Sequence, residues 1–518
     1  MERVKPANFI PHSKVELFND DEPLDFLPQN IKNPADFVSN YYANNPFSLS
    51  IKAIQQTIKP NEEKNDLPFL ISARSADLNK DNLDSNAYID LILVIDHSGS
   101  MEGKKIYMVK KSIFQMLEYL REHDRISIVM FDNKAIRLMP LVKNNQKNRE
   151  LINTAINYIE PDGGTNIHLG VEFAFQILKR RKYRNTVSSI MLLSDGLDDE
   201  CYPLITESLA KINLLHDFTL HTFGFGADHD PILMSEIAGL KNGSFYYVEK
   251  EEILDEVFVD CLGGLLSVVG VNAKIDFEIM QNPKIFGPNN QIKLKKIFGN
   301  TKKITDNSFS ISIPYIIYGM KKDFVAIMEI PKLGRDLQDH EKYLEMGRTQ
   351  LVFERPGKNK EKKQQMEEIK EDNENISYNI QKILYLTILN KDEEVKDYEK
   401  DEDVEINYLR VLAAEKMEEA RNEADKGNLQ EGINKINAVL EMAMKSKRKN
   451  NQEIMDLASN LGQAQKMMQP KIYEQKGRQF LECNKNAAMK QQSHPGVSEG
   501  YANSTQKRMV KNIRSKKN

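Results

Sequence analysis

An apolar run that ends abruptly in polar residues constrains the fold more than any other feature of this chain. Residues 89–95 read IDLILVI and are followed directly by Asp96-His97-Ser98-Gly99-Ser100. An apolar run of this length, without regular polar alternation, is typical of a strand that is buried on both faces of a parallel sheet. The loops after the carboxyl ends of such strands face the ligand-binding crevice. The sequence therefore predicts a ligand site immediately after residue 95.

Oxygen-bearing side chains alternate in this polar segment. Asp96, Ser98 and Ser100 are separated by single residues, and a loop that curls at Gly99 turns all three oxygens toward one point. Hard oxygens without a thiol or an imidazole suit Mg²⁺, and less specifically Mn²⁺ or Ca²⁺. The pattern favours metal-assisted binding over catalysis.

Two other segments offer the further oxygens that a metal ion needs. Gly163-Gly164-Thr165-Asn166 precedes a predicted helix, and Ser194-Asp195-Gly196 follows a second apolar strand pattern. Strand-end loops near the switch in strand order of a doubly wound sheet face the same crevice. We therefore expect one divalent cation to be surrounded by Asp96, Ser98, Ser100, Thr165 and Asp195.

These three segments resemble the metal-ion-dependent adhesion site of the von Willebrand factor type A domain. DHSGSM (96–101) matches the first motif of that family, GGTN (163–166) the second and SDG (194–196) the third, and the resemblance spans roughly 89–265. It implies direct ligation by Ser98, Ser100 and Thr165, with Asp96 and Asp195 acting mostly through bound waters. It also implies an open coordination position for a Glu or Asp of a protein partner. His97 occupies a variable position of the motif and receives no role.

Other segments are similar to a narrower group, the von Willebrand A proteins of plants and protists that include RING-type ubiquitin ligases. They are SSIMLLSDG (188–196), HTFGFGADHD (221–230), CLGGLLSVV (261–269) and the helical RVLAAEKMEEARNEADKGNL (410–429). A RING domain needs about eight Cys or His zinc ligands, and the three cysteines of this chain cannot assemble such a set. The resemblance therefore implies an accessory or substrate-recruiting role in a ubiquitin ligase complex and no ligase activity of the chain itself.

Periodicity divides the chain into parts. Strand and helix patterns alternate over 89–267, which predicts an α/β domain with a doubly wound, mostly parallel, Rossmann-like sheet. Strand patterns before and after this region predict an antiparallel β-sandwich into which the α/β unit is inserted. The predicted parts are a loose segment 1–45, strands 46–88, the von Willebrand A domain 89–267, a β-rich domain 268–355, a charged linker 356–376, a helical domain 377–484 and a basic tail 485–518.

Composition limits the location and the class of partner. The net charge of −4 gives no overall attraction to nucleic acid, and no apolar stretch is long enough for a membrane span. The three cysteines form no CxxC pair, which favours a reducing compartment, and the first residues lack the pattern of a signal peptide. We expect a cytoplasmic protein that binds another protein.

The polar residues also admit other interpretations. Ser98 and Ser100 lie outside a G-x-S-x-G motif and the chain lacks GxxxxGK[ST], so we expect no enzyme. Asp230 is expected to cap a helix and not to join His229 in a second metal site, and 198–200 is expected to form a solvated acidic rim. A structural protein with an unoccupied metal site remains the second alternative, after the ubiquitin-ligase subunit.

Overall fold

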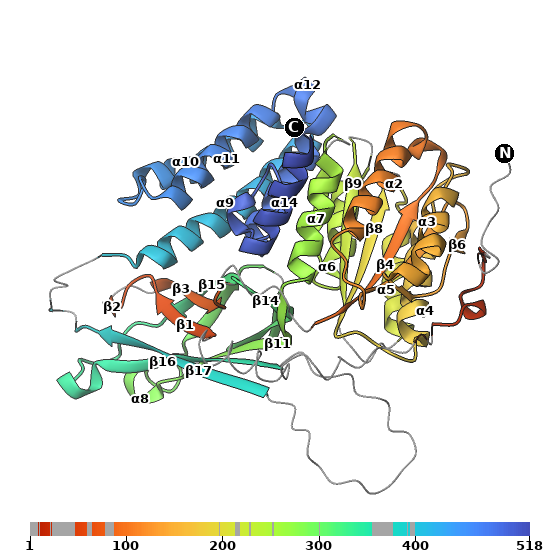
Figure 1. Ribbon diagram of the computed structural model, residues 1–518. Coiled ribbons are helices and arrows are strands. Elements are labelled where there is room, and N and C mark those ends of the chain that lie inside the picture. The colour runs from red at the N-terminus through yellow and green to blue at the C-terminus, as the bar shows by residue number, and fades with distance from the viewer. Residues whose placement is uncertain are drawn as a thin grey trace, which may run out of the picture.

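A computed structural model shows an α/β part, a β-sandwich and a group of C-terminal helices (Figure 1). The predicted linker 356–376 and most of the predicted loose segment 1–45 lie outside the residues that the structure describes. The described residues are 9, 11–20, 22, 47–59, 65–77, 87–195, 197–212, 218–226, 229–250, 253–299, 301–354, 377–390, 392–393 and 399–517.

The α/β part is built on a seven-stranded sheet with the order β10-β9-β8-β4-β5-β6, and β7 also pairs with β5. Pairing is parallel from β10 to β5, and only the short β6 and β7 run antiparallel to β5. The strands are β4 (Ile89–Asp96), β5 (Arg125–Phe131), β6 (Ala135–Arg137), β7 (Val142–Lys143), β8 (Val187–Ser194), β9 (Thr219–Phe225) and β10 (Phe245–Val248).

Helices cover both faces of this sheet, which explains why β4 has no polar alternation. Leu91 and Leu93 of β4 pack in the cluster that contains α2, α3 and α7, whereas Ile92 and Val94 pack in the cluster that contains α4, α5 and α6. The predicted doubly wound α/β fold is therefore confirmed. Its helices are α2 (Lys104–Leu117), α3 (Arg149–Tyr158), α4 (Ile167–Arg180), α5 (Cys201–Ile212), α6 (Pro231–Gly239) and α7 (Leu254–Leu265).

The sandwich consists of two sheets whose inner faces share one apolar core. One sheet has the order β1-β3-β15-β12 and the other β13-β14-β11-β16-β17-β2. The strands are β1 (Ser48–Ala53), β2 (Thr57–Ile58), β3 (Asn65–Arg74), β11 (Val268–Ile279), β12 (Lys293–Ile297), β13 (Lys302–Thr305), β14 (Ser308–Ile317), β15 (Lys321–Ile330), β16 (Tyr343–Glu354) and β17 (Ser377–Ile388), with the short helix α8 (Pro283–Phe286) between β11 and β12.

The α/β part is inserted into this sandwich, as the sequence predicts. β3 lies before the insertion and β15 after it, yet the two strands pair along their whole length, from Arg74 with Lys321 to Asn65 with Ile330. The hydroxyl of Tyr315 in β14 donates to the Ser188 carbonyl and accepts from the Ser188 amide, which joins the sandwich to β8.

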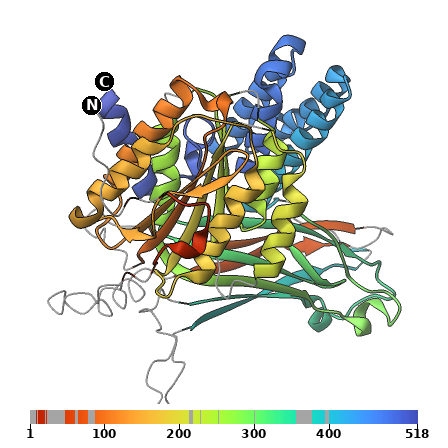
Figure 2. The same cartoon turned by 90° about the vertical axis from the view of Figure 1, so that its right-hand side faces the viewer.

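The C-terminal helices lie above the sandwich and beside the α/β part, as Figures 1 and 2 show from two directions. α9 and α10 form a hairpin, and Gly427 in its turn has a φ of 88°, a conformation that favours glycine. The helices are α9 (Glu402–Asp425), α10 (Leu429–Lys445), α11 (Gln452–Met467), α12 (Pro470–Ile472), the π-helical turn η6 (Tyr473–Gly477), α13 (Arg478–Lys490) and α14 (Ser504–Lys517); the 3₁₀-helices are η1 (Val15–Leu17), η2 (Gly99–Met101), η3 (Gln146–Asn148), η5 (Asp339–Glu341) and η7 (Glu499–Tyr501).

Three features of the predicted organisation differ from the structure. Residues 377–388, assigned to the helical domain, form strand β17, because their apolar side chains complete the sandwich core. β16 was not predicted at all, although 343–354 alternates buried and exposed residues as a strand does. Part of the predicted loose segment is also folded: Val15 is buried and Asp20 pairs with the buried Arg137.

The predicted basic tail 485–518 is largely helical instead. α14 packs Met509 and Ile513 into the apolar cluster that contains α7. Its basic side chains pair with acidic side chains of the α/β part: Arg514 and Lys517 contact Glu256, and Lys516 contacts Glu118. The chain itself therefore supplies acidic partners for this basic segment.

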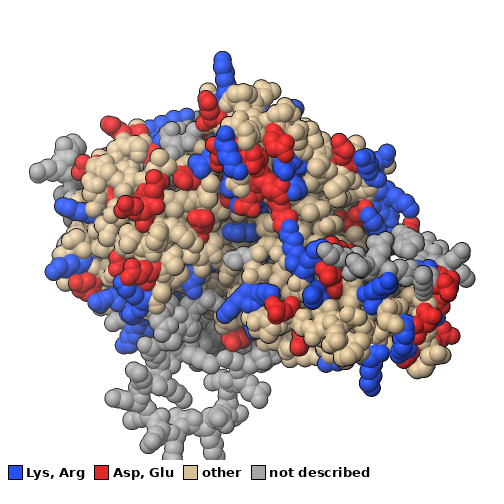
Figure 3. All heavy atoms as spheres, turned by 180° about the vertical axis from the view of Figure 1, so that it is seen from behind, with Lys and Arg blue, Asp and Glu red and all other residues tan. Residues whose placement is uncertain are grey.

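The face of the molecule shown in Figure 3 carries charges of both signs. Figure 3 shows acidic and basic side chains interspersed over the face seen from behind. Within the described part of the chain, no helix is both long enough and apolar enough to cross a membrane.

All three cysteines are buried and free, so none forms a disulfide.

A buried carboxyl group in α7 makes stability depend on pH. Asp260 is buried, accepts a hydrogen bond from Ser493 at 2.8 Å, and lies near His494 and Glu499. Burial raises its pKa to about 7, so the folded protein keeps a proton that the unfolded chain releases near pH 4. The folded state therefore loses stability as the pH rises from about 4 to about 7.

We predict that Asp260→Asn removes this loss. The variant should gain stability over the wild type as the pH rises from 4 to 8, by roughly 4 kcal/mol at most, and the two proteins should converge near pH 4. Melting temperatures measured across this range test the prediction. Asp336→Asn, which removes an exposed carboxylate, is the control and should show no such trend; the same trend in both variants would contradict the assignment to Asp260.

Candidate metal site

The first loop of the candidate site turns sharply at the end of β4. Asp96 is the last residue of this strand and its carboxylate is buried. One carboxylate oxygen accepts from the Ser98 amide at 2.8 Å and the other from the Ser194 hydroxyl at 2.5 Å. Asp96 therefore fixes the curl of its own loop and also holds the end of the neighbouring strand β8.

Three of the predicted ligands form one hydrogen-bonded chain. The Ser100 hydroxyl donates to Asp195 at 2.8 Å, and the Ser98 and Ser100 hydroxyl oxygens are 3.0 Å apart. Since the single proton of Ser100 goes to the carboxylate, Ser98 is the donor in the second bond. Ser98 and the side chain of Asp195 are buried, while Ser100, which lies between them in the chain of oxygens, is exposed. The chain therefore reaches the surface at Ser100.

The second loop is held against the first by backbone groups. The Gly99 amide donates to the Gly163 carbonyl at 3.1 Å, and the Asp162 amide donates to the His97 carbonyl at 2.7 Å. The His97 ring also bonds to the Glu160 carbonyl through Nδ1 at 2.8 Å. His97, to which the sequence assigned no role, thus positions the second loop from a buried place beneath it.

Thr165 is brought near this edge of the sheet but not into direct contact. It is half-buried, and among the described residues no hydrogen bond joins its hydroxyl to Asp96, Ser98, Ser100 or Asp195. Its neighbour Asn166 caps α4 by accepting from the Leu169 amide. The structure therefore brings together four of the five predicted residues and places the loop of the fifth beside them.

Acidic residues after Asp195 do more than form a solvated rim. Asp198 accepts from the Ile167 amide at 2.8 Å, so it joins the third loop to the first turn of α4. Asp230 accepts from the Ile232 and Leu233 amides, which confirms the predicted helix cap. Gly196 and Asp228 lie outside the described residues.

Two buried carboxylates share this edge with one ammonium group. Burial raises the pKa of Asp96, and the neighbouring charge of Asp195 acts in the same direction, whereas hydrogen bonds from Ser194 and Ser98 oppose the shift. The side chain of Asp195 is fully buried, and Lys105 from the first turn of α2 forms an ion pair with it. Sequence reasoning missed Lys105, because nothing in a basic residue of a helix indicates which carboxylate it will contact.

The donor set can hold a hard cation. Within the described residues there is no cluster of three or more His, Cys, Asp or Glu with metal-binding geometry. Any metal at this edge would instead be bound by hydroxyl and carboxylate oxygens, and these are the ligands that Mg²⁺ prefers.

Comparison with known proteins identifies the part of the chain that carries these loops. Residues 90–259 match the family model of the von Willebrand factor type A domain. An uncharacterised protein of Synechocystis sp. is 31% identical over 200 residues, which cover 38% of this chain and 47% of that protein. The E3 ubiquitin-protein ligase WAV3 of Arabidopsis thaliana is 26% identical over 247 residues, covering 47% of this chain and 31% of that protein. The chain thus spans less than half the length of these curated relatives.

Solved structures share the fold over most of the chain. A von Willebrand factor type A protein from Catenulispora acidiphila superimposes with a TM-score of 0.60 at 14% identity, covering 86% of this chain and 96% of its own. The ArnB paralog VWA2 from Sulfolobus acidocaldarius gives a TM-score of 0.52 at 16% identity, covering 86% of this chain and 99% of its own. Both likenesses extend well beyond residues 90–259.

The backbone of the second loop offers a direct test of this geometry. Gly163 has a φ of 68°, and a Cβ there would lie 2.7 Å from Asp132 Oδ2. Gly427, in the turn between α9 and α10, has a φ of 88° but no atom within 4 Å of its Cβ position. Gly427→Ala should therefore cost about 1–2 kcal/mol of stability through its conformation alone, and Gly163→Ala should cost more because Asp132 must also move. Chemical denaturation measures both values, and equal losses would contradict the close packing of the second loop.

Proposed function

Because residues 90–259 form a von Willebrand factor type A domain, a type of domain that mediates protein–protein interactions, we propose that this chain binds a protein partner through a divalent cation. Ser98, Ser100 and Thr165 would ligate the cation directly, and Asp96 and Asp195 would act mostly through bound water. Mg²⁺ is the proposed ion, with Mn²⁺ or Ca²⁺ as substitutes. When bound, it attracts the carboxylate of a Glu or Asp on the partner.

The observation that carries this proposal is the chain of contacts from Ser98 through Ser100 to Asp195. It gathers two hydroxyls and a carboxylate at one place, where the buried Ser98 and Asp195 lie on either side of the exposed Ser100. The Thr165 loop is attached beside it through Gly99 and Gly163, and we propose that Thr165 completes the coordination by a small rotation of its side chain.

Exposed apolar side chains near these loops fit a protein partner. Leu197 is 59% exposed and follows Asp195 by two residues, while Tyr107 and Leu204 are 63% and 43% exposed in the first turns of α2 and α5. Tyrosine is enriched in the energetically important part of protein interfaces, and exposed leucine side chains add apolar surface that a partner can bury. We propose that they supply affinity, and that the metal supplies orientation and selectivity.

We propose binding without catalysis. Within the described part of the chain, no imidazole lies within hydrogen-bond distance of Ser98 or Ser100, whose hydroxyls bond to each other and to Asp195. A serine nucleophile needs such a base.

We also propose a cytoplasmic location, which the free, buried cysteines support.

The similarity to WAV3 supports a second candidate function. In this alternative, the chain recruits substrates to a ubiquitin ligase complex, with the metal-dependent surface capturing the substrate. Co-purification with a separate RING protein would support it.

Ser98→Ala should weaken Mg²⁺ or Mn²⁺ binding at least about tenfold, because it removes a proposed ligand. The melting temperature without metal should change little. Isothermal titration calorimetry measures the affinity, and Thr154→Ala, which removes an exposed hydroxyl from α3, is the matched control. An unchanged affinity in the Ser98 variant would contradict the proposed coordination.

Lys105→Met should have the opposite effect. An ammonium group paired with Asp195 repels a cation that approaches the same carboxylate, so its removal should raise the affinity for Mn²⁺ at least about tenfold. Lys111→Met makes the same change in net charge on the exposed face of α2 and should leave the affinity unchanged. A weaker affinity in the Lys105 variant would show that Lys105 orients Asp195 for the metal.

A further inference from the structure

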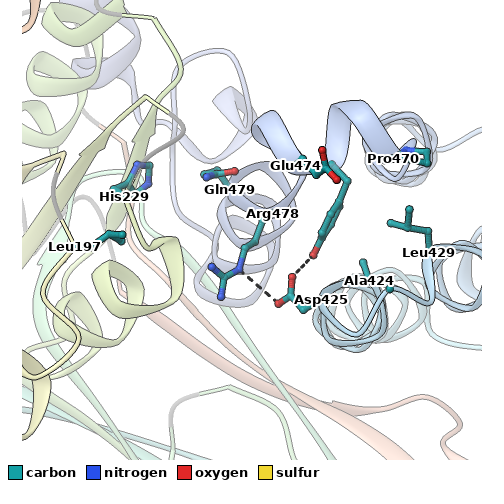
Figure 4. A pocket seen from close by; sticks show the side chains of 11 residues that line it. Leu197, His229, Ala424, Asp425, Leu429, Pro470, Glu474, Arg478 and Gln479 are labelled. Atoms are coloured by element: carbon teal, nitrogen blue, oxygen red, sulfur yellow. Dashed lines mark hydrogen bonds and ion pairs between the residues drawn. The ribbon is translucent and has the colours of Figure 1, made fainter. Parts of the chain in front are cut away.

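A cavity of about 440 Å³ lies beside the third loop of the candidate site, between the α/β part and the C-terminal helices. Figure 4 shows Leu197 and His229 on its α/β side and the ends of helices on the other. Leu197 follows Asp195 by only two residues, a span of roughly 7 Å at most. A partner segment bound at the metal would therefore reach this cavity within a few residues.

Arg478 is the one cationic residue among those that line the cavity, all of which are described. Its Nε lies 3.5 Å from Asp425, and its side chain is 37% exposed. Figure 4 shows the two terminal nitrogens directed away from Asp425, toward the side of Leu197 and His229. No hydrogen bond joins these two nitrogens to any described residue, so the flat, forked face of the guanidinium remains available.

Two carboxylates, those of Asp425 and Glu474, line the cavity together with Arg478, and neither bonds to its terminal nitrogens. Asp425 already accepts a hydrogen bond from the Tyr473 hydroxyl at 2.6 Å, and Glu474 is exposed, so solvent screens its charge. Burial lowers the pKa of His229 to about 4, so this residue is neutral at pH 7 and neither attracts nor repels a carboxylate.

The helix that carries Arg478 is irregular at this point. The π-helical turn η6 ends at Gly477, directly before Arg478, and Tyr473 and Glu474 of the same turn also line the cavity. Gly477 allows the close approach, because a Cβ there would lie 2.5 Å from the Met467 carbonyl oxygen. Single π-helical turns occur frequently at functional sites, where they change the direction of side chains.

We propose that this cavity binds a second acidic side chain of the same partner, whose carboxylate accepts two hydrogen bonds from the terminal nitrogens of Arg478. The partner is then a segment with two acidic residues a few positions apart, one at the metal and one at Arg478. Guanidinium and carboxylate groups pair in this two-bond geometry more strongly than neutral groups do. This inference rests on the proposed function, because the metal binds the first acidic residue.

Synthetic peptides test the proposal with the full chain in Mg²⁺. One series carries a single Glu, a second carries two Glu separated by spacers of increasing length, and a third replaces the second Glu with Lys. Fluorescence polarisation should show that the best peptide with two Glu binds at least about tenfold more tightly than the peptide with one. Arg478→Gln should abolish this gain and leave the binding of the single-Glu peptide unchanged.

Two further variants make the test specific. Arg448→Gln is the matched control, because Arg448 is 35% exposed and lies 3.6 Å from one carboxylate, Glu402. It follows the C-terminal end of α10, whereas the cavity lies at the other end of this helix, at Leu429. Arg478→Glu should reverse the preference, so that the Glu–Lys peptide binds more tightly than the Glu–Glu peptide. A reversal of this kind cannot result from misfolding.

The outcomes separate this inference from the proposed function. Mg²⁺-dependent binding of the single-Glu peptide without a gain from the second Glu would overturn the inference alone. A gain that persists in Arg478→Gln, or a preference of the wild type for the Glu–Lys peptide, would also overturn it. Equal binding in Mg²⁺ and in EDTA would contradict the metal-dependent capture itself. No binding of any peptide would contradict both the metal-dependent capture and the inference about Arg478.

Discussion

The two hydrogen bonds accepted by the buried carboxylate of Asp96 determine the geometry of the site. One of them curls the loop that holds Ser98, and the other holds the end of β8 through Ser194. The parallel register of β4 and β8 makes this possible, because Ile95 lies beside Leu193 and the next residues of both strands reach the edge together. A carboxylate with two such partners can remain buried in a place where an isolated charge would be costly.

The loops around Asp96 are linked to one another by groups that are not among the proposed metal ligands. His97 and Gly99 hold the second loop from the first, and Asp198 holds the start of α4 from the third. A displacement of any one loop therefore breaks hydrogen bonds in another. This mutual dependence favours a site that is formed before its ligands arrive, which reduces the entropic cost of binding.

The sequence was sufficient to predict the sheet, because it depends on local patterns. The apolar run before Asp96 and the alternation of strands and helices predicted the α/β fold. The first and third strand-end motifs contain the four residues that hydrogen bonds join at this edge, whereas their coordination of a metal stays a prediction. The roles of Lys105, His97 and Asp198 were not predictable in this way, since each depends on a residue far away in the sequence. The same applies to α14, whose basic composition conceals a buried face that only the tertiary structure defines. β17 is rich in apolar residues, but the sequence alone did not show that they belong to the sandwich.

The insertion of the α/β part into the sandwich has a consequence for the order in which the chain folds. β3 and β15 must pair although the whole inserted unit separates them in the sequence. Asp66 of β3, for example, pairs with Glu329 of β15. Closing so long a loop of disordered chain carries a large entropic cost and slows folding. If the inserted unit folds first, its compact body shortens the effective loop, and the two halves of the sandwich meet at lower cost. The topology therefore favours a pathway in which the portion that carries the site is complete before the scaffold around it closes.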